Sequence, residues 1–309
     1  MTDTLRRPIW LDGKLVPPAT ATLPVMSHAA HRGSLAFDFG AFHVTPRSIS
    51  VFRLRDHVER LRRSVAFLGL SLGHETAALV LATQQTVHAS ELSEGWVRWS
   101  AFVSTPEPDL VPRTSRVSVA IAAYISSDLL GGGEVAAPRP AALRIAVFQD
   151  ARKAPPEVFP PLAKIAAAYA GPMIAKRRAH AAGADEVLLL DADGSVAEAP
   201  TSNVFAVIDG SLVTPPLGRI LDGITRDSVL ALARAESVPV QERSLSLAEL
   251  CAADEAFLTA SSFPIAPIAS INGSLLKKPA PGPLTTRLLA LLREAERGGD
   301  ARFLAWTAD

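Results

Sequence analysis

The sequence has little cysteine, no excess charge and no long apolar run, and each absence excludes a class of protein. Cys251 is the only cysteine among 309 residues, so no disulfide can form within the chain, which suits a reducing compartment. The 31 basic residues equal the 31 acidic ones, which leaves no net basic field to attract nucleic acid or an acidic membrane. The opening residues, MTDTLRRPIW, lack the apolar stretch of a signal peptide, and no apolar run is long enough to span a membrane. We therefore expect a cytoplasmic protein that binds neither nucleic acid nor membrane.

The length and composition indicate a globular chain of two domains. With 309 residues, 48% of them hydrophobic and 20% charged, the chain can bury two cores of ordinary size. A stretch rich in glycine and proline, SSDLLGGGEVAAPRPA, is predicted to be the linker between them. Its three consecutive glycines are also compatible with a phosphate loop, but no strand–glycine–helix context supports that alternative. The predicted organisation is an N-terminal α/β domain at 1–125, a linker at 126–141 and a C-terminal α+β domain at 142–309.

Hydrophobic periodicity and turn residues predict hairpins and helices along both halves. Apolar residues that recur every three or four positions, as at Val58, Leu61 and Val65, indicate helices, and Asp-Gly between two apolar runs indicates hairpins. Because the second half mixes hairpins with helices, we assign it to the α+β class with much antiparallel sheet. The predicted hairpins are 9–16, 185–199 and 203–215, the predicted helices are 55–70, 75–90, 173–182, 225–237 (capped by Thr225) and 283–297, and further predicted strands are 96–103, 116–125, 142–150 and 255–261.

Lys164 is the only charged residue between Val158 and Ala175, in a stretch of small apolar residues. Burying a lysine without a partner is costly, so a lysine in such surroundings invites a chemical explanation. A desolvated lysine loses its proton more readily, and the neutral amine is a nucleophile that can form a Schiff base with an aldehyde. The alternative is a lysine whose stem packs on apolar groups while its ammonium reaches water.

Further segments carry weaker signals for an anionic, ring-containing ligand. Glu198 ends a predicted hairpin strand among apolar neighbours, where its carboxylate could pair with a protonated ring nitrogen or simply face water. In LDGITRDSV, Gly223 precedes a helix whose first N–H groups, at Ile224 and Thr225, favour a phosphate, although an ordinary helix start has the same groups.

Arg55, Ser261 and Ser262 could complete such an anion site. Arg55 lies at the head of a predicted helix and could supply a fixed positive charge, or it could be a solvated arginine. The two serines follow a buried strand, where a hydroxyl can bind an anion or close a turn. His28 and His31 could suggest a metal pair, but no further cluster completes a metal site, so we interpret them as structural and expect no metal.

The order and spacing of these residues resemble one family. The chain is similar to the class IV aminotransferases, the fold-type IV enzymes that depend on pyridoxal 5′-phosphate, and most of all to branched-chain amino acid aminotransferases. The group also contains D-amino-acid aminotransferases, R-selective amine transaminases and aminodeoxychorismate lyase. The resemblance extends from IWLDGKLV to FLTASSFPIAPI, and its strongest blocks are VMSHAAHRGSLAFD, FRLRDHVERL, K-x4-Y, GADEVLLLDADGSVAEAPTSNVF and LDGITRD.

The resemblance implies a fold and a cofactor site. The fold is that of D-amino-acid aminotransferase, with a small N-terminal α/β domain, a larger barrel-like C-terminal domain and the cofactor between them. Lys164 would carry pyridoxal 5′-phosphate as a Schiff base, and Glu198 would keep its ring nitrogen protonated. The remaining cofactor-binding residues that the resemblance implies are Arg55, the backbone of Ile224 and Thr225 after Gly223, and Ser261 for the phosphate, Leu221 against the ring, and Tyr169 beside the phenolic oxygen. Lys164 and Tyr169 are the two candidate catalytic residues.

The resemblance further implies a reaction. An amino donor would displace Lys164, which would then move a proton between the α-carbon of the substrate and the C4′ carbon of the cofactor. A 2-oxo acid such as 2-oxoglutarate would take up the amino group in a second half-reaction, with ping-pong kinetics. Family members are typically homodimers, so we expect a homodimer or a higher homo-oligomer.

The chain departs from branched-chain aminotransferases in the segments expected to face the substrate. Arg32 stands where those enzymes carry an aromatic residue, FDFGAFH replaces their FEG, and Trp96 replaces a tyrosine next to Arg98, which is kept. Arg32 and Arg98 are therefore the candidate carboxylate binders, and an inward-pointing Arg32 would favour an acidic or D-configured substrate. The predicted substrate-binding set is Arg32, Phe37, Trp96, Arg98 and Ser262.

Three hypotheses about function follow from the resemblance. The first is a transaminase of branched-chain type, with a D-amino-acid or R-amine transaminase as its variant. The second is a lyase that releases pyruvate from an aminated chorismate, against which Tyr169 argues. The third is a protein that binds the cofactor without catalysis, against which the retained Lys164, Glu198 and Arg55 argue.

Overall fold

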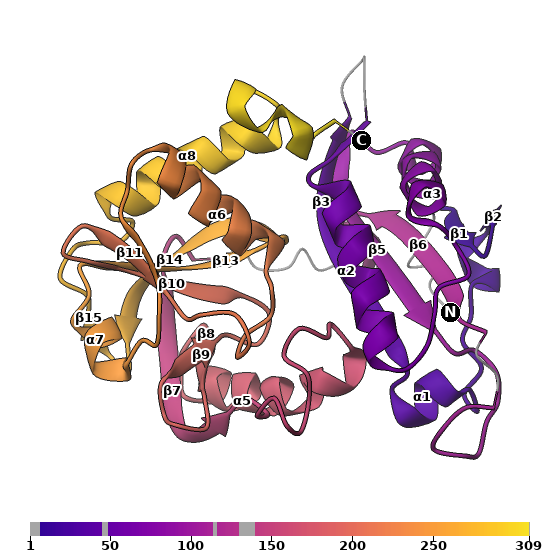
Figure 1. Cartoon of the computed structure of the whole chain (residues 1–309), viewed down its shortest axis with the longest axis horizontal. Helices are drawn as coiled ribbons and strands as arrows, with labels where there is room; N and C mark the ends of the chain where they lie inside the picture. The colour runs from indigo at the N-terminus through magenta and orange to yellow at the C-terminus, as the bar shows by residue number, and fades with distance from the viewer. Residues whose placement is uncertain (1–6, 45–48, 114–115, 130–139, 309) are drawn as a thin grey trace. The chain divides into compact units, whose positions relative to one another are not determined.

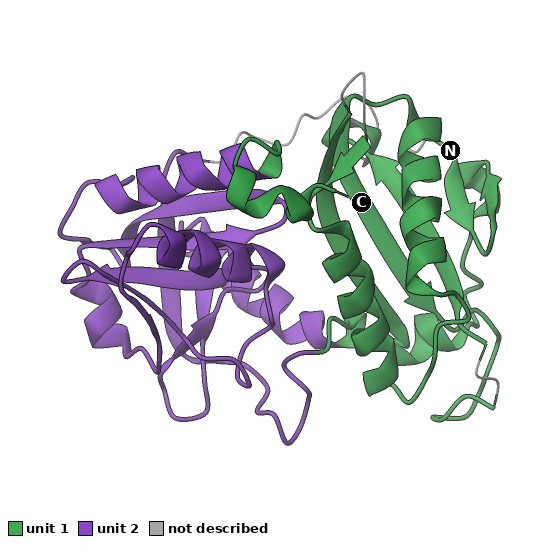
Figure 2. Cartoon of the chain, turned by 45° about the horizontal axis from the view of Figure 1, so that its top comes forward, with its two compact units in different colours: residues 1–138, 163–167, 296–309 green, residues 139–162, 168–295 purple. Residues whose placement is uncertain are grey.

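Contacts within the chain divide it into two units (Figure 2). The structure is a computed structural model that describes residues 7–44, 49–113, 116–129 and 140–308. Unit 1 comprises 1–138, 163–167 and 296–309, and unit 2 comprises 139–162 and 168–295. The sequence assigned 163–167 and 296–309 to the C-terminal domain, whereas the contacts place both in unit 1, through long-range pairing that no local pattern indicates. The predicted boundaries at 125 and 142 stay a prediction.

Unit 1 is built on one antiparallel sheet. Its strand order is β2-β1-β6-β5-β3-β4, and every neighbouring pair is antiparallel. The first two strands form the predicted hairpin, with Asp12 and Gly13 at φ 45° and 100° in its turn. The longest pairing joins β3 to β5 and was not expected, because no alternating polar pattern marks β3. The strands are β1 (Ile9–Leu11), β2 (Lys14–Val16), β3 (Leu35–Val44), β4 (Ile49–Val51), β5 (Glu94–Phe102) and β6 (Ser118–Tyr124).

Two long helices cover this sheet (Figure 1). The helix α2 (Leu54–Phe67) packs against β3, α3 (Thr76–Ser90) packs against β6, and the two helices also contact each other. Val58, Leu61 and Val65 are almost fully buried, because their spacing puts them on the face of α2 that meets the sheet. Shorter elements of this unit are η1 (Pro18–Thr20), α1 (His28–Arg32), α4 (Ser126–Leu129) and η3 (Ala301–Trp306).

Unit 2 contains a curled mixed sheet. The strand order is β12-β11-β10-β13-β14-β7-β8-β9, with β15 beside β14, and the β11–β12, β14–β7 and β7–β8 pairs are parallel. β9 forms one edge and β10 lies near the other, yet the two contact each other, so the sheet must curl. The strands are β7 (Leu143–Arg152), β8 (Glu186–Leu190), β9 (Val196–Glu198), β10 (Asn203–Ile208), β11 (Ser211–Thr214), β12 (Val240–Glu242), β13 (Glu255–Ala260), β14 (Phe263–Ile271) and β15 (Ser274–Leu275).

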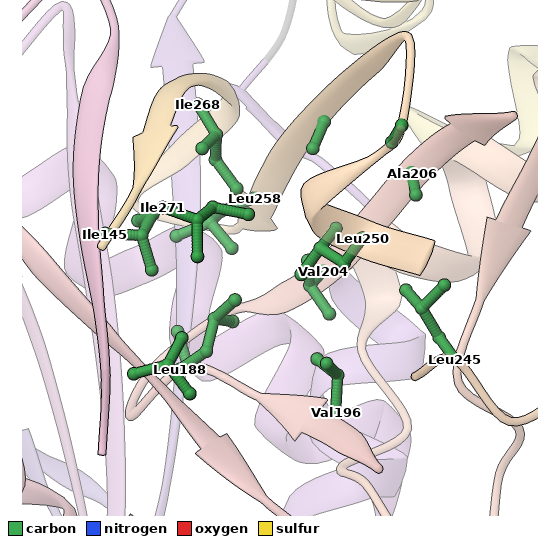
Figure 3. Close-up of a cluster of buried hydrophobic side chains, with 14 of the residues drawn as sticks. Ile145, Leu188, Val196, Val204, Ala206, Leu245, Leu250, Leu258, Ile268 and Ile271 are labelled. Atoms are coloured by element: carbon green, nitrogen blue, oxygen red, sulfur yellow. The ribbon is translucent and has the colours of Figure 1, made fainter. Parts of the chain in front are cut away.

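Aliphatic side chains fill the inside of this curl. Figure 3 shows Leu188, Val204, Leu258 and Ile268 converging from four different strands, and each is fully buried. The helix α5 packs on β7 and β8 through Ala175 and Ala179, small residues that allow close approach. The helical elements that belong to or lead into unit 2 are η2 (Ala166–Tyr169), α5 (Ala170–Ala181), α6 (Ile224–Ala235), α7 (Leu247–Cys251) and α8 (Pro283–Glu296).

The structure confirms the predicted mixed α/β class and corrects one local detail. Thr225 was expected to cap the helix that it opens, but Gly223 is the N-cap residue of α6, no side chain caps it, and Thr225 lies one position inside the helix. The predicted linker begins with the helix α4, while residues 130–139 lie outside the described residues. Gly13, Gly194 and Gly210 lie in the predicted hairpin turns, and Gly183 follows the predicted helix that ends at residue 182. All four glycines have positive φ.

Candidate active site

The backbone of Lys164 is attached to the sheet and to a helix of unit 1. The Lys164 carbonyl accepts a hydrogen bond from Phe37 N on β3 (3.0 Å), and Ala36 forms a bridge with Ile165. The Lys164 N–H donates to the hydroxyl of Ser64 on α2 (3.0 Å), which in turn donates to the Arg60 carbonyl (2.9 Å). These bonds hold the lysine at the edge of β3 although its neighbours along the chain, 139–162 and 168–295, belong to unit 2.

The side chains of Lys164 and Arg98 both contact the aromatic ring of Phe37. Lys164 Nζ lies 5.0 Å from the centroid of the Phe37 ring, and Arg98 Cζ lies 4.4 Å from the same centroid. Cations at such distances are attracted to the negative face of a ring by about 0.5–2 kcal/mol. Three residues predicted for the site, Lys164, Phe37 and Arg98, are therefore brought together in unit 1.

An aromatic group lies next to Arg98. Trp96 and Tyr124 have ring centroids 6.4 Å apart, and Phe39 is within 6.4 Å of both. Burial raises the pKa of Tyr124, while a hydrogen bond with Arg98 opposes that rise. The predicted substrate residue Trp96 thus belongs to an aromatic cluster that includes Tyr124, the hydrogen-bond partner of Arg98.

A buried charge network lies under this cluster, and the sequence did not reveal it. Arg60 Nε and Nη2 donate to the two carboxylate oxygens of Asp38 (both 2.8 Å), and His57 Nδ1 is 2.7 Å from Asp38 Oδ1. Burial alone would raise the pKa of Asp38, but Arg60 and His57 hold it well below its usual range. Burial lowers the pKa of His57, against the opposing effect of Asp38, and Lys164 contributes to the lowering. His57 is therefore a neutral donor to an ionised Asp38.

The carboxylate of Glu198 lies among hydrogen-bond donors. Glu198 lies at the end of β9 and is 8% exposed, and its carboxylate accepts hydrogen bonds from Asn203 Nδ2 (3.0 Å) and Leu221 N (3.1 Å). Lys153, on the segment after β7, forms an ion pair with the same carboxylate. Lys153 and Asn203 were missed by sequence reasoning. Asn203 lies within the EAPTSNVF block and could have been noticed there, whereas nothing near Lys153 marks it.

The start of α6 is shaped by close packing at Gly223. A Cβ atom at Gly223 would lie 1.9 Å from Asn203 Oδ1, so only glycine fits there. Asn203, the first residue of β10, also donates to the Leu221 carbonyl (3.1 Å), which ties the start of β10 to the segment before the helix. Ile224 and Thr225 are the first two residues of α6, where backbone N–H groups and the helix dipole favour an anion.

The other predicted cofactor residues lie at element ends. Arg55 is the second residue of α2 and is exposed, and Tyr169 is the half-buried N-cap residue of α5. Ser261 and Ser262 form the turn between β13 and β14, with Ser261 half-buried and Ser262 exposed. Their roles stay predictions.

The remaining candidates lie around α1. Arg32 is exposed and its Nη2 donates to the Pro108 carbonyl (3.3 Å). His28 is buried, with Nδ1 2.8 Å from Ser34 Oγ and Nε2 3.1 Å from the Leu110 carbonyl, while His31 is exposed. The bonds of His28 are those of a histidine that holds two loops together.

A family model described as amino-transferase class IV matches residues 41–271, which is more than half of the chain. The chain belongs to the class IV aminotransferases. The matched region contains Arg55, Lys164, Glu198 and the start of α6, whereas Arg32, Phe37 and Asp38 lie before it.

Curated relatives of this aminotransferase match almost its whole length. The branched-chain-amino-acid aminotransferase of Pseudomonas aeruginosa is 30% identical over 280 residues, which cover 91% of this chain and 90% of that protein. The enzyme of the same name from Escherichia coli K12 is 29% identical over 282 residues, with the same coverage.

Solved structures of aminotransferases match the fold. The branched-chain aminotransferase of Thermoproteus uzoniensis, crystallised with norvaline, has a TM-score of 0.88 and 33% identity over 97% of this chain and 98% of that one. The branched-chain enzyme of Thermobaculum terrenum, in its holo-form with the cofactor, has a TM-score of 0.88 and 27% identity, over 98% of each chain. A further branched-chain enzyme, crystallised with pyridoxamine 5′-phosphate, has a TM-score of 0.90 and 29% identity, again over 98% of each chain. These matches confirm the predicted fold-type IV architecture and the prediction of a transaminase that depends on pyridoxal 5′-phosphate.

The residues of this aminotransferase fit that cofactor. Glu198 is a buried carboxylate surrounded by donors, as a partner of a protonated ring nitrogen requires. Gly223 lets Asn203, which bonds to Glu198, pack directly against the start of α6. The hydroxyls of Ser202 and Thr259, at the paired ends of β10 and β13, are buried without a hydrogen-bond partner, so further donors are available in the same part of unit 2.

Among the described residues, none of the helices combines the length and apolar character needed to cross a membrane.

Proposed function

We propose that this aminotransferase moves the amino group of a branched-chain L-amino acid to a 2-oxo acid such as 2-oxoglutarate. The observation that carries the proposal is the 97% overlap, at 33% identity, with a branched-chain aminotransferase crystallised with norvaline, an unbranched aliphatic amino acid. A second branched-chain enzyme, which matches over 98% of this chain at 29% identity, has been crystallised with 4-methylvaleric acid and with N-(5′-phosphopyridoxyl)-L-glutamate. A branched aliphatic acid and an L-glutamate adduct are what the two half-reactions would require.

The proposed cofactor residues act by charge and by donated hydrogen bonds. Arg55, the N–H groups of Ile224 and Thr225 and the hydroxyl of Ser261 would hold the phosphate, because an anion is stabilised by fixed donors and by the dipole of a helix start. Glu198 would accept the hydrogen bond of the protonated ring nitrogen, held in place by Asn203. Leu221 would pack against the ring, and Tyr169 would contact the phenolic oxygen.

The proposed catalytic residue is Lys164. Bound pyridoxal phosphate supplies a conjugated pyridinium ring that accepts the electron pair left when the substrate loses its α-proton. Lys164 would hold the cofactor until an amino donor replaces it, and its free amine would then move the proton between the α-carbon and the C4′ carbon. The bonds from Phe37 N and to Ser64 Oγ fix the backbone from which the amine extends, so that the transfer starts from a defined position.

Arg98 is a better candidate than Arg32 for binding the substrate carboxylate. Arg98 is half-buried, with its guanidinium over the Phe37 ring and hydrogen-bonded to Tyr124, where a carboxylate would be paired away from water. Arg32 is exposed and bonded to a loop carbonyl, which gives no support to an acidic or D-configured substrate. Phe37 and Trp96 would contact the apolar side chain of the substrate, and Ser262 would contribute a further polar group.

The proposal also covers the cellular location and the oligomeric state of the protein. A cytoplasmic homodimer or higher homo-oligomer is consistent with the single cysteine and with the long match to aminotransferases. Light scattering of the purified holoenzyme measures the assembly, and a monomer at working concentration would contradict it.

The test is a set of half-reactions. The yellow holoenzyme is mixed with single amino donors, and loss of the cofactor absorbance is followed together with the 2-oxo acid formed. We expect L-leucine, L-isoleucine and L-valine to bleach the band and 2-oxoglutarate to restore it. Bleaching by D-amino acids or R-amines instead would assign the chain to those transaminases, pyruvate release from aminodeoxychorismate would assign it to the lyases, and no reaction with any donor would overturn the proposal.

A further inference from the structure

The segment after α8 packs against the start of α2 within unit 1. Its helical turn η3 carries Trp306, whose backbone carbonyl accepts a hydrogen bond from Arg53 N (2.6 Å). The indole ring also meets the Arg53 guanidinium, whose Cζ is 5.4 Å from the ring centroid, and it meets Phe52 edge-on at 5.6 Å. One residue late in the sequence therefore contacts both the backbone and the side chain of the residue that begins α2.

Arg53 needs such an external contact. It is the N-cap residue of α2 and adopts the left-handed conformation, with φ 52° and ψ 43°, which residues other than glycine avoid. No side chain caps the helix, and the Arg53 side chain is directed to Asp56 (2.5 Å). The conformation is thus fixed from outside the helix, by Trp306 and by the buried Phe52.

Trp306 is itself held in one orientation. Phe303 stacks on it with ring centroids 4.1 Å apart and an interplanar angle of 22°. Asp300 caps η3 by accepting from Arg302 N (3.0 Å), and its carboxylate also pairs with the Arg302 guanidinium. These contacts within η3 orient the indole ring and its carbonyl toward Arg53.

We propose that Trp306 is a positioning residue for Arg55. Arg55 lies two residues after Arg53, in the first turn of α2, so the geometry of the helix start decides where its guanidinium can reach. The inference rests on the proposed role of Arg55 in holding the cofactor phosphate. Trp306 acts at a distance from the phosphate: it fixes the left-handed Arg53, and Arg53 fixes the turn from which Arg55 extends.

The test compares two ligands that differ only in the phosphate. Full-length protein stripped of cofactor is titrated with pyridoxal 5′-phosphate and with pyridoxal, and the dissociation constants are measured by absorbance. We expect Trp306→Ala to weaken pyridoxal 5′-phosphate by about tenfold, the equivalent of about 1.4 kcal/mol, and to leave pyridoxal nearly unchanged. Trp306→Phe, which keeps an aromatic face, should recover most of the loss. Leu304→Ala changes an exposed residue of the same turn and is the matched control.

A double-mutant cycle shows whether the effect passes through Arg55. In an Arg55→Ala background, Trp306→Ala should cause no further loss of pyridoxal 5′-phosphate binding. Equal weakening of both ligands, or losses that add in the double variant, would overturn the inference and leave the role of Arg55 intact. If Arg55→Ala alone does not weaken pyridoxal 5′-phosphate relative to pyridoxal, the proposed role of Arg55 fails and the inference fails with it. Urea unfolding of each variant identifies a general loss of stability. If Trp306→Ala is generally destabilised, recovery of pyridoxal 5′-phosphate binding in Trp306→Phe supports the inference, and no recovery overturns it.

Discussion

His57 is a histidine that the fold keeps neutral. Its ring stacks on Trp99 at 5.5 Å, its Nδ1 bonds to Asp38, and its side chain is 1% exposed. Asp38 in turn is shared with Arg60, and the Arg60 carbonyl accepts from Ser64, which holds the backbone of Lys164. A single buried carboxylate thus organises the part of unit 1 from which the proposed catalytic lysine extends.

The lowered pKa of His57 predicts how stability depends on pH. An unfolded histidine takes up a proton as pH falls through about 6.5, whereas folded His57 does so only at lower pH, because burial disfavours its charged form. The unfolded state then binds more protons, so the free energy of unfolding falls as pH drops below about 6.5, by up to about 1.4 kcal/mol per pH unit for this group.

The variant His57→Asn isolates this contribution. It keeps a donor for Asp38 and removes the titrating ring, so the free energy of unfolding in urea should be lower at pH 7 but should fall less steeply between pH 7 and pH 5. His31→Asn, at an exposed position, is the control. Equal slopes for the wild type and His57→Asn would contradict the account.

At the scale of elements, a close contact couples α1 to the segment that carries Lys164. Gly33 ends α1 at φ 71°, and a Cβ there would lie 3.0 Å from the Cβ of Ala167. Gly183, which follows α5 at φ 79°, has open space around it. The two glycines have similar left-handed conformations, which cost glycine nothing, and only Gly33 packs against residues 163–167.

Alanine variants of Gly33 and Gly183 separate the cost of a left-handed alanine from the effect of shifting Lys164. Both variants should lose about 1–2 kcal/mol of stability, because an L-residue resists the left-handed conformation. Gly33→Ala should in addition lower kcat by about fivefold to tenfold through a shift of Lys164, since small misplacements of a reacting group are costly. Gly183→Ala should keep kcat within about twofold of wild type. Steady-state kinetics and urea unfolding check both, and equal kcat values for the two variants would show that the contact does not reach the lysine.

Sequence patterns correctly predicted the hairpins and helices that are determined by neighbouring residues. The Asp-Gly hairpins at Asp12, Asp193 and Asp209 and the apolar face of α2 follow from turn chemistry and helical period. The long strand β3, whose residues Leu35–Val44 alternate little in polarity, was missed, because its pairing with β5 and with Ile165 is fixed by distant partners. Thr225 was taken for a cap because threonine commonly is one, whereas Gly223 has that position under the constraint of Asn203.

At the scale of the whole molecule, the chain passes between its two units more than once. Residues 163–167 and 296–309 belong to unit 1, while the segments next to them in sequence belong to unit 2. A sequence pattern cannot indicate this, because each segment is short and its partners on β3 and at Arg53 are more than a hundred residues away. The order of motifs, by contrast, was sufficient for the family, since Arg55, Lys164, Glu198 and LDGITRD lie within the region that the class IV aminotransferases share.

The central claim is that Lys164 is the residue that carries the cofactor, and borohydride reduction tests it most directly. The holoenzyme is reduced, digested and mapped by mass spectrometry, with Lys153 and Lys176 as internal comparisons because each lies in an ion pair with a glutamate. The account predicts one phosphopyridoxyl label, at Lys164. A label at any other lysine, or no label on a protein that binds pyridoxal 5′-phosphate, would contradict it.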